Sequence, residues 1–469
     1  MIMKKKLFYL LMISCVACLQ VGCNHEKDVV LNDATSGTSV GDDEGDLVEN
    51  QSWTSSLDIV WNGSSATVSG SVDGVAVTNS NGYVTVTSTV DGLVYNLSGS
   101  GSGQLCIYSD YKCQLALQGL TLSCTNGPAI NNQSNKTCYV VVNSTNTLSD
   151  GSSYASSSED RKAAFFSEGQ ICFSGTGTLN ITGNYQHALA SDDYIRLCTG
   201  MTATINLTAK VNDGIHANDG ILIEAGTLSV NAKDECIRTD EDGAIQITGG
   251  TITAISQSEA IESKGTLTIS GGQIYAQGSD DAINSGGDLT ISGGCVMAYS
   301  TGNDGIDANG NCYIQGGLVY VIGANSPEVA IDANSEQQKQ LYVTGGTLVA
   351  IGGLESGASL SQTCYSASSW SKSTWYALTV GSDVFAFRTP SSGGSTLVVS
   401  GASTPTLTSG VTASGTAIFN DMGYYPASVS GGSSVTLSTY SGGNSGGGPG
   451  GGGNPGGGGN PGGGGPGGW

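Results

Sequence analysis

The sequence predicts an all-β protein, a right-handed parallel β-helix with a small additional β region near its C-terminus. The first observation is the composition. Of the 469 residues, 73 are Gly and only 12% are charged, which is atypical of helical bundles and coiled coils. The second observation is a repeat. A short apolar motif recurs every 22–25 residues, with its Ile at positions 215, 237, 261, 283, 306 and 331.

Each repeat contains three short apolar segments and a pair of glycines. In one repeat, Leu289–Ile291 precedes the pair Gly293–Gly294, and Cys295–Ala298 follows it. One coil of this kind cannot bury its own apolar face, whereas stacked coils form continuous ladders about 4.8 Å apart. β-Propellers and leucine-rich repeats have other periods and signatures. The interval from Ile130 to Phe165 exceeds one coil, which predicts an inserted loop between them.

The first residues are typical of a secretory signal. Lys4–Lys6 precede an apolar run over 7–19, too short for a membrane-spanning helix. Cys23 follows in a context that resembles the lipobox of bacterial lipoproteins, in which the Cys is lipidated after cleavage. We therefore expect an extracytoplasmic protein, lipid-anchored to the bacterial membrane at the outer membrane or cell surface. An ordinary secretory signal is the alternative.

Composition shifts divide the rest of the chain. Polar and acidic residues after Cys23 are typical of a flexible tether, and the last residues are almost all Gly, Pro, Asn and Ser, which cannot bury a core. The predicted segments are a signal peptide (1–22), a tether (23–52), the β-helix (53–353), a small β region (354–440) and a disordered tail (441–469).

The chain is strongly acidic. Asp and Glu outnumber Lys and Arg by 39 to 16, which gives a net charge of -23. A nucleic-acid-binding protein needs a basic face, so we exclude nucleic acid as a partner. We expect a monomer.

The Asp and Glu side chains of the repeats are the candidates for a functional site. The coil repeat places acids at one corner on successive rungs, just before and just after the Ile ladder, where neighbouring like charges repel one another. Ca²⁺ is the natural counter-charge, because it takes six to eight oxygens from Asp, Glu, Asn and carbonyl groups. A solvated acidic corner without metal is the alternative. The predicted Ca²⁺ ligands are Asp213, Glu235, Glu259, Asp280, Asp281, Asn303, Asp304 and Asp307, of which the last five form the densest group.

We expect the cysteines and histidines to have structural rather than catalytic or metal-binding roles. Cys113, Cys138 and Cys312 stand at inward positions, where a small apolar side chain fits the core. Cys172 and Cys198 fall on outward positions of neighbouring coils, where they could cross-link. We do not expect the three histidines, at positions 25, 187 and 216, to make a multi-histidine metal site.

Several motifs in fixed order resemble the bacterial carbohydrate-binding β-helix family, typified by cellulose- and pectin-binding surface proteins of cellulolytic clostridia. They are Asn146–Tyr154, Gly175–Leu179 with Thr182–Tyr185, and the related segments Asp213–Ala217 and Asp304–Ala308. The resemblance implies bound Ca²⁺ held by Asp of the Asp-Gly-Ile type, affinity for plant-wall polysaccharide, and a fold like that of polysaccharide lyases.

Three functions remain open from the sequence. The first is a Ca²⁺-dependent polysaccharide-binding protein without enzymatic activity, in which outward aromatic rings stack on sugars. The second is a polysaccharide lyase with Lys264 or Arg238 as base. The third is an adhesin or scaffold without sugar specificity. The predicted sugar-binding residues form two columns, Tyr313 with Tyr342 and Tyr275 with Tyr320.

Overall fold

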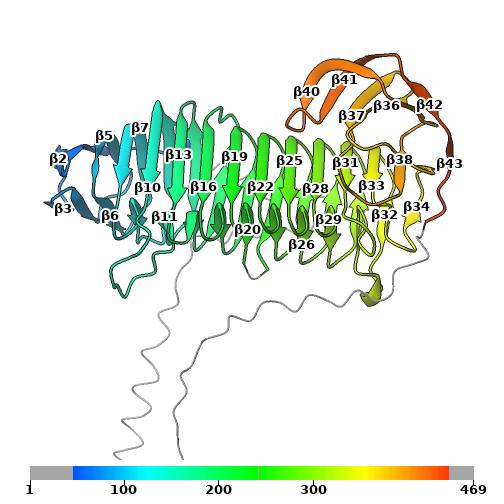
Figure 1. Cartoon of the computed structure of the whole chain (residues 1–469). Coiled ribbons are helices and arrows are strands. Elements are labelled where there is room, and N and C mark those ends of the chain that lie inside the picture. The colour runs from blue at the N-terminus through cyan, green and yellow to red at the C-terminus, as the bar shows by residue number, and fades with distance from the viewer. Residues whose placement is uncertain (1–45, 241, 443–469) are drawn as a thin grey trace, which may run out of the picture. The chain divides into compact units, whose positions relative to one another are not determined.

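The computed structural model describes residues 46–240 and 242–442. The chain divides into two compact units: one runs to Ala254 and includes Glu262–Gly272, and the other comprises Ile255–Ile261 and the residues from Gln273. Within each unit, short strands stack coil upon coil (Figure 1). The described part of the chain has two short 3₁₀ turns, η3 (Val48–Asn50) and η4 (Ser335–Gln337), and no helix there is long and apolar enough to cross a membrane. The predicted parallel β-helix is confirmed.

In the first unit each full coil contributes strands to three parallel columns. The first column contains β1 (Ser55–Gly63), β5 (Leu93–Ser102), β7 (Cys113–Ser123), β9 (Cys138–Asn143), β12 (Ile171–Gly175), β15 (Tyr194–Leu197), β18 (Gly220–Ile223), β21 (Ala244–Ile247) and β24 (Leu267–Ile269). The second contains β10 (Thr145–Ser149), β13 (Thr178–Gly183), β16 (Thr204–Ala209) and β19 (Thr227–Ala232). The third contains β4 (Tyr83–Ser88), β6 (Gln104–Ser109), β8 (Ile130–Asn132), β11 (Ala163–Ser167), β14 (His187–Ser191), β17 (Ile215–Ala217) and β20 (Ile237–Thr239).

Four further strands complete the first unit or mark its limit. β2 (Ser65–Ser69) and β3 (Val75–Ser80) pair in antiparallel fashion with β1 and β4 at the start of the unit. The chain passes between the units within β22 (Thr251–Ser256) and β23 (Ile261–Ser263).

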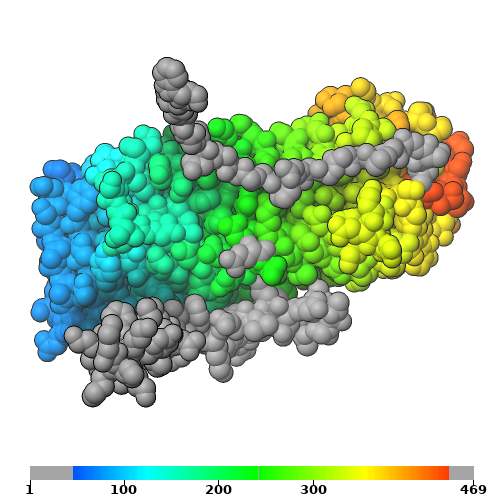
Figure 2. Space-filling view, turned by 90° about the horizontal axis from the view of Figure 1, so that it is seen from below, coloured from blue at the N-terminus to red at the C-terminus, as the bar shows by residue number. Residues whose placement is uncertain are grey.

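The repeated aliphatic residues form the core as expected. Leu189 on β14, Ile215 on β17 and Ile237 on β20 are partners in register, and none is exposed. The residue that follows each of these core residues in the sequence projects to the other face of the strand. Each coil therefore places a core residue and an outward residue next to each other. Residues one coil apart therefore lie in neighbouring bands of colour on the surface of each unit (Figure 2). Between β10 and β11 the chain makes no strand over 150–162, which confirms the inserted loop.

Residues just before the first strand pack on this unit. Leu47 and Val48 are buried in one apolar cluster with Cys172, Cys198 and Tyr194. The packed part of the chain therefore begins before residue 53, inside the segment expected to be a tether. Cys172 and Cys198 are both free thiols and fully buried. Cys113, Cys138 and Cys312, at the inward positions, are also free thiols and are at most 2% exposed.

The second unit contains coils of the same pattern. One column contains β25 (Gln273–Gly278), β28 (Cys295–Ser300), β31 (Leu318–Ile322) and β33 (Thr347–Ile351), another β27 (Leu289–Ile291), β30 (Cys312–Ile314), β32 (Leu341–Val343) and β34 (Ser359–Leu360), and a third β26 (Ile283–Ser285) and β29 (Ile306–Ala308). The glycine pairs are required at the corners. Gly317 has a φ of 76°, and a Cβ on Gly316 would lie 2.2 Å from the carbonyl oxygen of Ser292.

The parallel pattern ends after β34, a few residues beyond the predicted end of the β-helix at 353. Three strands, β35 (Cys364–Ala367), β38 (Leu397–Ser400) and β43 (Leu437–Thr439), add antiparallel pairs. Six others form a separate antiparallel sheet: β36 (Trp375–Val380), β37 (Asp383–Arg388), β39 (Thr406–Ser409), β40 (Thr412–Ile418), β41 (Gly423–Ser430) and β42 (Ser433–Val435). The predicted small C-terminal β region is confirmed.

Candidate functional site

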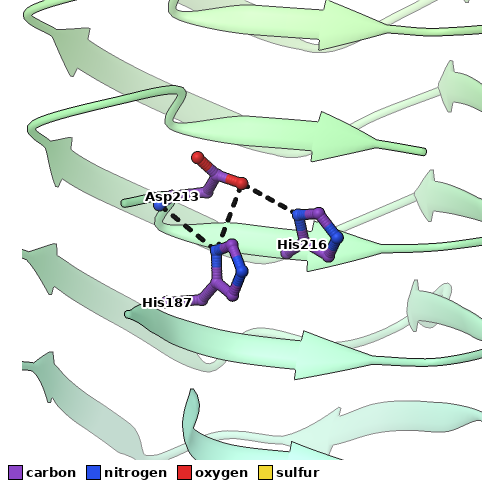
Figure 3. Close-up of side chains that lie close together, drawn as sticks. All are labelled: His187, Asp213 and His216. Carbon is purple, nitrogen blue, oxygen red and sulfur yellow. Dashed lines mark hydrogen bonds and ion pairs between the residues drawn. The ribbon is translucent and has the colours of Figure 1, made fainter. Parts of the chain in front are cut away.

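The first unit brings two histidines and an aspartate together at one corner (Figure 3). His187 begins β14, and Asp213 and His216 flank the core residue Ile215 on the next coil. The Oδ2 atom of Asp213 lies 3.2 Å from Nδ1 of His187 and 2.8 Å from Nδ1 of His216. The two imidazole rings stack at a centroid distance of 4.2 Å. All three residues are at least 93% buried.

The charges of this group depend on one another. Burial opposes ionisation of Asp213, but its hydrogen bonds with His187 and His216 outweigh that cost and hold its pKa well below the ordinary value. Burial lowers the pKa of His187. The same cost for His216 is exceeded by its contacts with Asp213 and Asp240, which raise its pKa. His216 Nε2 lies 3.2 Å from Asp240 Oδ2.

His187 and His216 lie side by side, a pair that the sequence did not lead us to expect, since no multi-histidine metal site was predicted. The signal was available in the repeat. The alignment that places Leu189 below Ile215 also places His187 below Asp213. His216 is the outward residue next to that same Ile.

A neighbouring set of acids in the same unit contains Asp213, Asp234 and Glu235, which offer carboxylate oxygens within 4.8 Å of one another. Two of these were predicted as metal ligands. Burial, and then the nearby charge of Asp213, raises the pKa of Glu235 to about 9. Arg238 compensates part of this charge, since its Nη1 lies 3.1 Å from Glu235 Oε2.

The two basic residues of the first unit considered as lyase bases are both ion-paired with acids. Arg238 contacts Asp240 and, at 3.5 Å, Glu262. Lys264 is ion-paired with Glu262. The structure therefore shows these cations as partners of the acidic corner.

In the second unit the predicted ligands form a linked chain along one corner. The Nδ2 of Asn284 donates to Oδ2 of Asp281 at 3.0 Å and to Oδ2 of Asp307 at 3.3 Å. Asp281 Oδ1 accepts the backbone N–H of Asp304 at 3.0 Å. Asn303 donates to Asp280 at 2.8 Å. Glu259, in this unit as well, accepts a hydrogen bond from Ser258.

Burial makes ionisation of these acids costly. It is the largest cause that raises the pKa of Asp281 to about 9, of Asp304 to about 8 and of Asp307 to about 6, and the charges of neighbouring acids add to it. In the described residues of this unit, no Lys or Arg forms an ion pair with any of the three. Asp332 and Glu355, which the predicted ligand set lacked, extend the group: burial and then Glu355 raise the pKa of Asp332 to about 10.

This acidic corner fits a hard cation. Its side-chain donors are carboxylate and amide oxygens, which Ca²⁺ prefers, and it offers neither thiolate nor imidazole. The buried carboxylates of Asp281, Asp304 and Asp307 carry raised pKa values, so a divalent ion would remove an electrostatic cost that the protein itself leaves in place. The ligand oxygens would need to converge, because the groups with ligand atoms already within 4.8 Å in the described residues lie around Asp213.

The predicted sugar-binding tyrosines divide into two kinds. Tyr313 and Tyr342 are half-buried and stack on each other, with centroids 5.0 Å apart and planes at 11°. One face of each ring is therefore covered by the other ring. Tyr275 is 6% exposed and Tyr320 is fully buried, both within the apolar cluster of the C-terminal β region. For these two, the expectation of an exposed stacking surface is wrong, because the repeat gives no sign of what covers an outward column.

Fold and corner residues together define a parallel β-solenoid protein with acid-lined and histidine-lined corners. Residues 80–328 match the family described as carbohydrate-binding domain-containing protein, and the chain belongs to this family. The family resemblance seen in the motifs is thereby confirmed. No curated protein matches the chain. A solved structure, a polysaccharide lyase-like protein from C. thermocellum in a gadolinium derivative, is similar over 56% of this chain and 99% of that chain, with 22% identity and a TM-score of 0.40.

Proposed function

We propose that this chain is a Ca²⁺-dependent polysaccharide-binding lipoprotein of the bacterial cell surface. The observation that carries the proposal is the family match over residues 80–328. The matched residues include most of the coils whose Asp and Glu side chains form the acidic corners. The family supports a carbohydrate ligand, and the acidic corner supports a divalent cation.

Ca²⁺ would be held in the second unit by Asp281, Asp304 and Asp307, with Asp280 and Asn303 alongside. When bound, it supplies positive charge at a corner of buried carboxylates and can complete its shell with oxygens of a ligand. In the first unit the acids of the ladder already have cationic partners, Arg238 for Glu235 and His216 for Asp213. We therefore assign the Ca²⁺ requirement to the second unit.

Charge limits the choice of polysaccharide. A protein with a net charge of -23 repels a polyuronate at long range, so binding an acidic glycan of the plant cell wall requires a bridging cation. A neutral glycan such as cellulose needs no bridge and would use apolar and hydroxyl contacts. Tyr313 and Tyr342 would offer ring edges and phenol oxygens to either ligand.

We propose binding without cleavage. A lyase needs a free base beside the substrate, whereas Lys264 is ion-paired with Glu262 and Arg238 contacts three carboxylates. These contacts favour a role for both residues in balancing the acidic corner.

The test is co-sedimentation of the purified protein with insoluble cellulose, and gel-shift with polygalacturonate, each with Ca²⁺ or with chelator. We expect retention that chelator weakens for the acidic glycan. Tyr313→Ala with Tyr342→Ala should weaken binding, and Lys264→Ala should not. The same samples are monitored for an absorbing unsaturated product. Its appearance, with loss in Lys264→Ala, would establish a lyase, and failure to bind any glycan with Ca²⁺ would leave an adhesin or scaffold.

Attachment to the membrane is tested separately. Cys23 lies outside the described residues, so the proposal rests on the sequence of the signal segment. Cys23→Ala should move the protein from the membrane fraction to the soluble fraction, because a lipid chain is the proposed anchor. A variant that remains in the membrane fraction like the unchanged protein would contradict lipidation at this residue.

A further inference from the structure

We propose that His187, Asp213 and His216 form a binding site for a divalent transition-metal ion, separate from the Ca²⁺ corner. Their two Nδ1 atoms and one carboxylate oxygen lie within 4.8 Å of one another. The inference does not rest on polysaccharide binding, since it concerns side chains of the first unit alone.

The ring nitrogens of the group can direct lone pairs toward its centre once a metal ion replaces the proton on His216. Nδ1 of His187 accepts the backbone N–H of Asp213 at 3.3 Å, and an accepting nitrogen carries a lone pair. Nε2 of His216 lies 3.2 Å from Asp240 Oδ2, and its Nδ1 lies 2.8 Å from Asp213 Oδ2, so without metal each ring nitrogen can donate to a carboxylate. A metal ion would take the place of the proton on Nδ1 of His216, and the lone pairs of both Nδ1 atoms would then be directed at an ion that Oδ2 of Asp213 also contacts.

Without metal, the proton on Nδ1 of His216 is the positive charge that these three atoms share. One proton on a histidine satisfies only one pair of these atoms, whereas a metal ion satisfies all three. Asp240 stands behind His216 as the carboxylate that commonly orients a metal-bound imidazole. The stacked rings hold both Nδ1 atoms on the same side, on adjacent coils (Figure 3).

The donor set selects the class of metal. Two imidazoles and one carboxylate suit Zn²⁺, Co²⁺ and Cu²⁺, whereas Ca²⁺ requires oxygen ligands. Ligands about 2.1 Å from a tetrahedral ion lie about 3.4 Å from one another. The observed 3.2 Å from His187 to Asp213 fits, and the 2.8 Å from His216 would open by about half an ångström. Three protein ligands leave one position for a solvent or ligand oxygen.

The experiment uses the full chain without a polyhistidine tag, stripped with chelator and titrated with Zn²⁺ against a chromophoric competitor. We expect one equivalent to bind. Asp240→Asn should lower the affinity about 10–100-fold, as loss of an orienting carboxylate does elsewhere. His187→Ala and His216→Ala should each lower it further, because each removes a ligand. Matched controls are His25→Ala, another histidine, and Asp304→Asn, in the Ca²⁺ corner; both should bind Zn²⁺ as the unchanged protein does.

A measurement on the unchanged protein keeps the test independent of variant folding. Cu²⁺ bound at this site should show electron paramagnetic resonance couplings to two imidazole nitrogens, and Co²⁺ should show visible bands of a four-coordinate nitrogen and oxygen site. A sulfur-to-metal charge-transfer band would place the ion on cysteine and overturn the proposal. So would absence of Zn²⁺ binding near neutral pH, or binding that survives both histidine substitutions but is lost in Glu235→Gln.

Discussion

The phenol of Tyr320 donates a 2.9 Å hydrogen bond to the backbone carbonyl of Arg388. Tyr320 is an outward residue of β31 in the coiled part of the second unit, and Arg388 ends β37 of the antiparallel sheet. The rings of Phe385 and Phe387 lie 6.0 and 5.2 Å from the Tyr320 ring. The C-terminal β region therefore covers an outward face of the coils with a second apolar core, and that column is closed to ligands.

Tyr320→Ala should destabilise the second unit strongly. The side chain is fully buried, and truncating a buried aromatic residue costs about 3–5 kcal/mol. Tyr320→Phe removes only the hydroxyl and its hydrogen bond to the Arg388 carbonyl, which costs about 0.5–1.5 kcal/mol. The measurement is chemical denaturation of each variant. The control is Tyr313→Ala, at a half-buried position, for which we expect about 1 kcal/mol. Equal losses for Tyr320→Ala and Tyr313→Ala would show that the C-terminal sheet does not cover the column in solution.

Asp304→Asn should change stability in opposite directions with and without Ca²⁺. In chelator the substitution removes a buried carboxylate whose pKa is raised to about 8, so the variant should melt at or above the temperature of the unchanged protein near pH 8. With Ca²⁺ the unchanged protein gains RT ln(1 + [L]/Kd), about 2.7 kcal/mol at a hundredfold excess of free ion over Kd. The variant should gain less, because it has lost an anionic ligand. Thermal melts in both buffers measure the crossover, and curves unaffected by chelator would contradict a Ca²⁺ site here.

The metal-free protein should become less stable as the pH rises from about 4 to about 9. Asp281 and Asp304 titrate near 3.8 when unfolded, whereas burial raises their folded pKa values to about 9 and 8. The folded state then holds protons that the unfolded state has released, so the free energy of unfolding falls with rising pH across this interval. We expect a loss of more than about 2 kcal/mol between pH 5 and pH 9 in chelator.

The control for this pH dependence is the double variant Asp281→Asn and Asp304→Asn, in which both groups no longer titrate. Its stability should vary less between pH 5 and pH 9. Saturating Ca²⁺ should also reduce the slope for the unchanged protein, because bound metal favours the ionised carboxylates. If the free energy of unfolding changed with pH by the same slope in the unchanged protein and in the double variant, the pH dependence would belong to other groups.

The repeat predicted the coils because one physical requirement recurs in each of them. Ile215, Ile237 and Ile306 must all face inward, and Gly317 must adopt a positive φ at its corner. A period of 22–25 residues therefore placed the acids of the corner correctly relative to the core. The same period also contained the position of His187 below Asp213, although the sequence analysis did not use it.

Contacts between residues far apart in the sequence lay beyond the repeat. The burial of Tyr320 depends on Phe385 and Phe387, which follow the last parallel coil, and no periodicity connects them. Likewise Cys172 and Cys198 occupy outward positions that Leu47 and Val48 cover. Outward positions of a solenoid look alike in the sequence whether they meet solvent or a second layer, so exposure there could not be predicted.

Arg238→Ala should destabilise the first unit more than Lys264→Ala does. Arg238 is 27% exposed at its side chain and contacts the acids Glu235, Asp240 and Glu262, two of them almost fully buried. Removing it leaves buried carboxylates without their cation, a loss that we place at about 2–3 kcal/mol, between the values for buried and exposed pairs.

Lys264 provides the matched comparison for Arg238, since it contacts the same Glu262 from a side chain that is 37% exposed. Water screens such a pair, so Lys264→Ala should cost less than about 1 kcal/mol. Denaturation curves of the two variants at neutral pH give the comparison, and added salt should widen the difference, because it screens the more exposed Lys264 pair first. Equal costs would mean that Arg238 does not balance the buried acids, and that the charge at this corner is compensated by an ion instead.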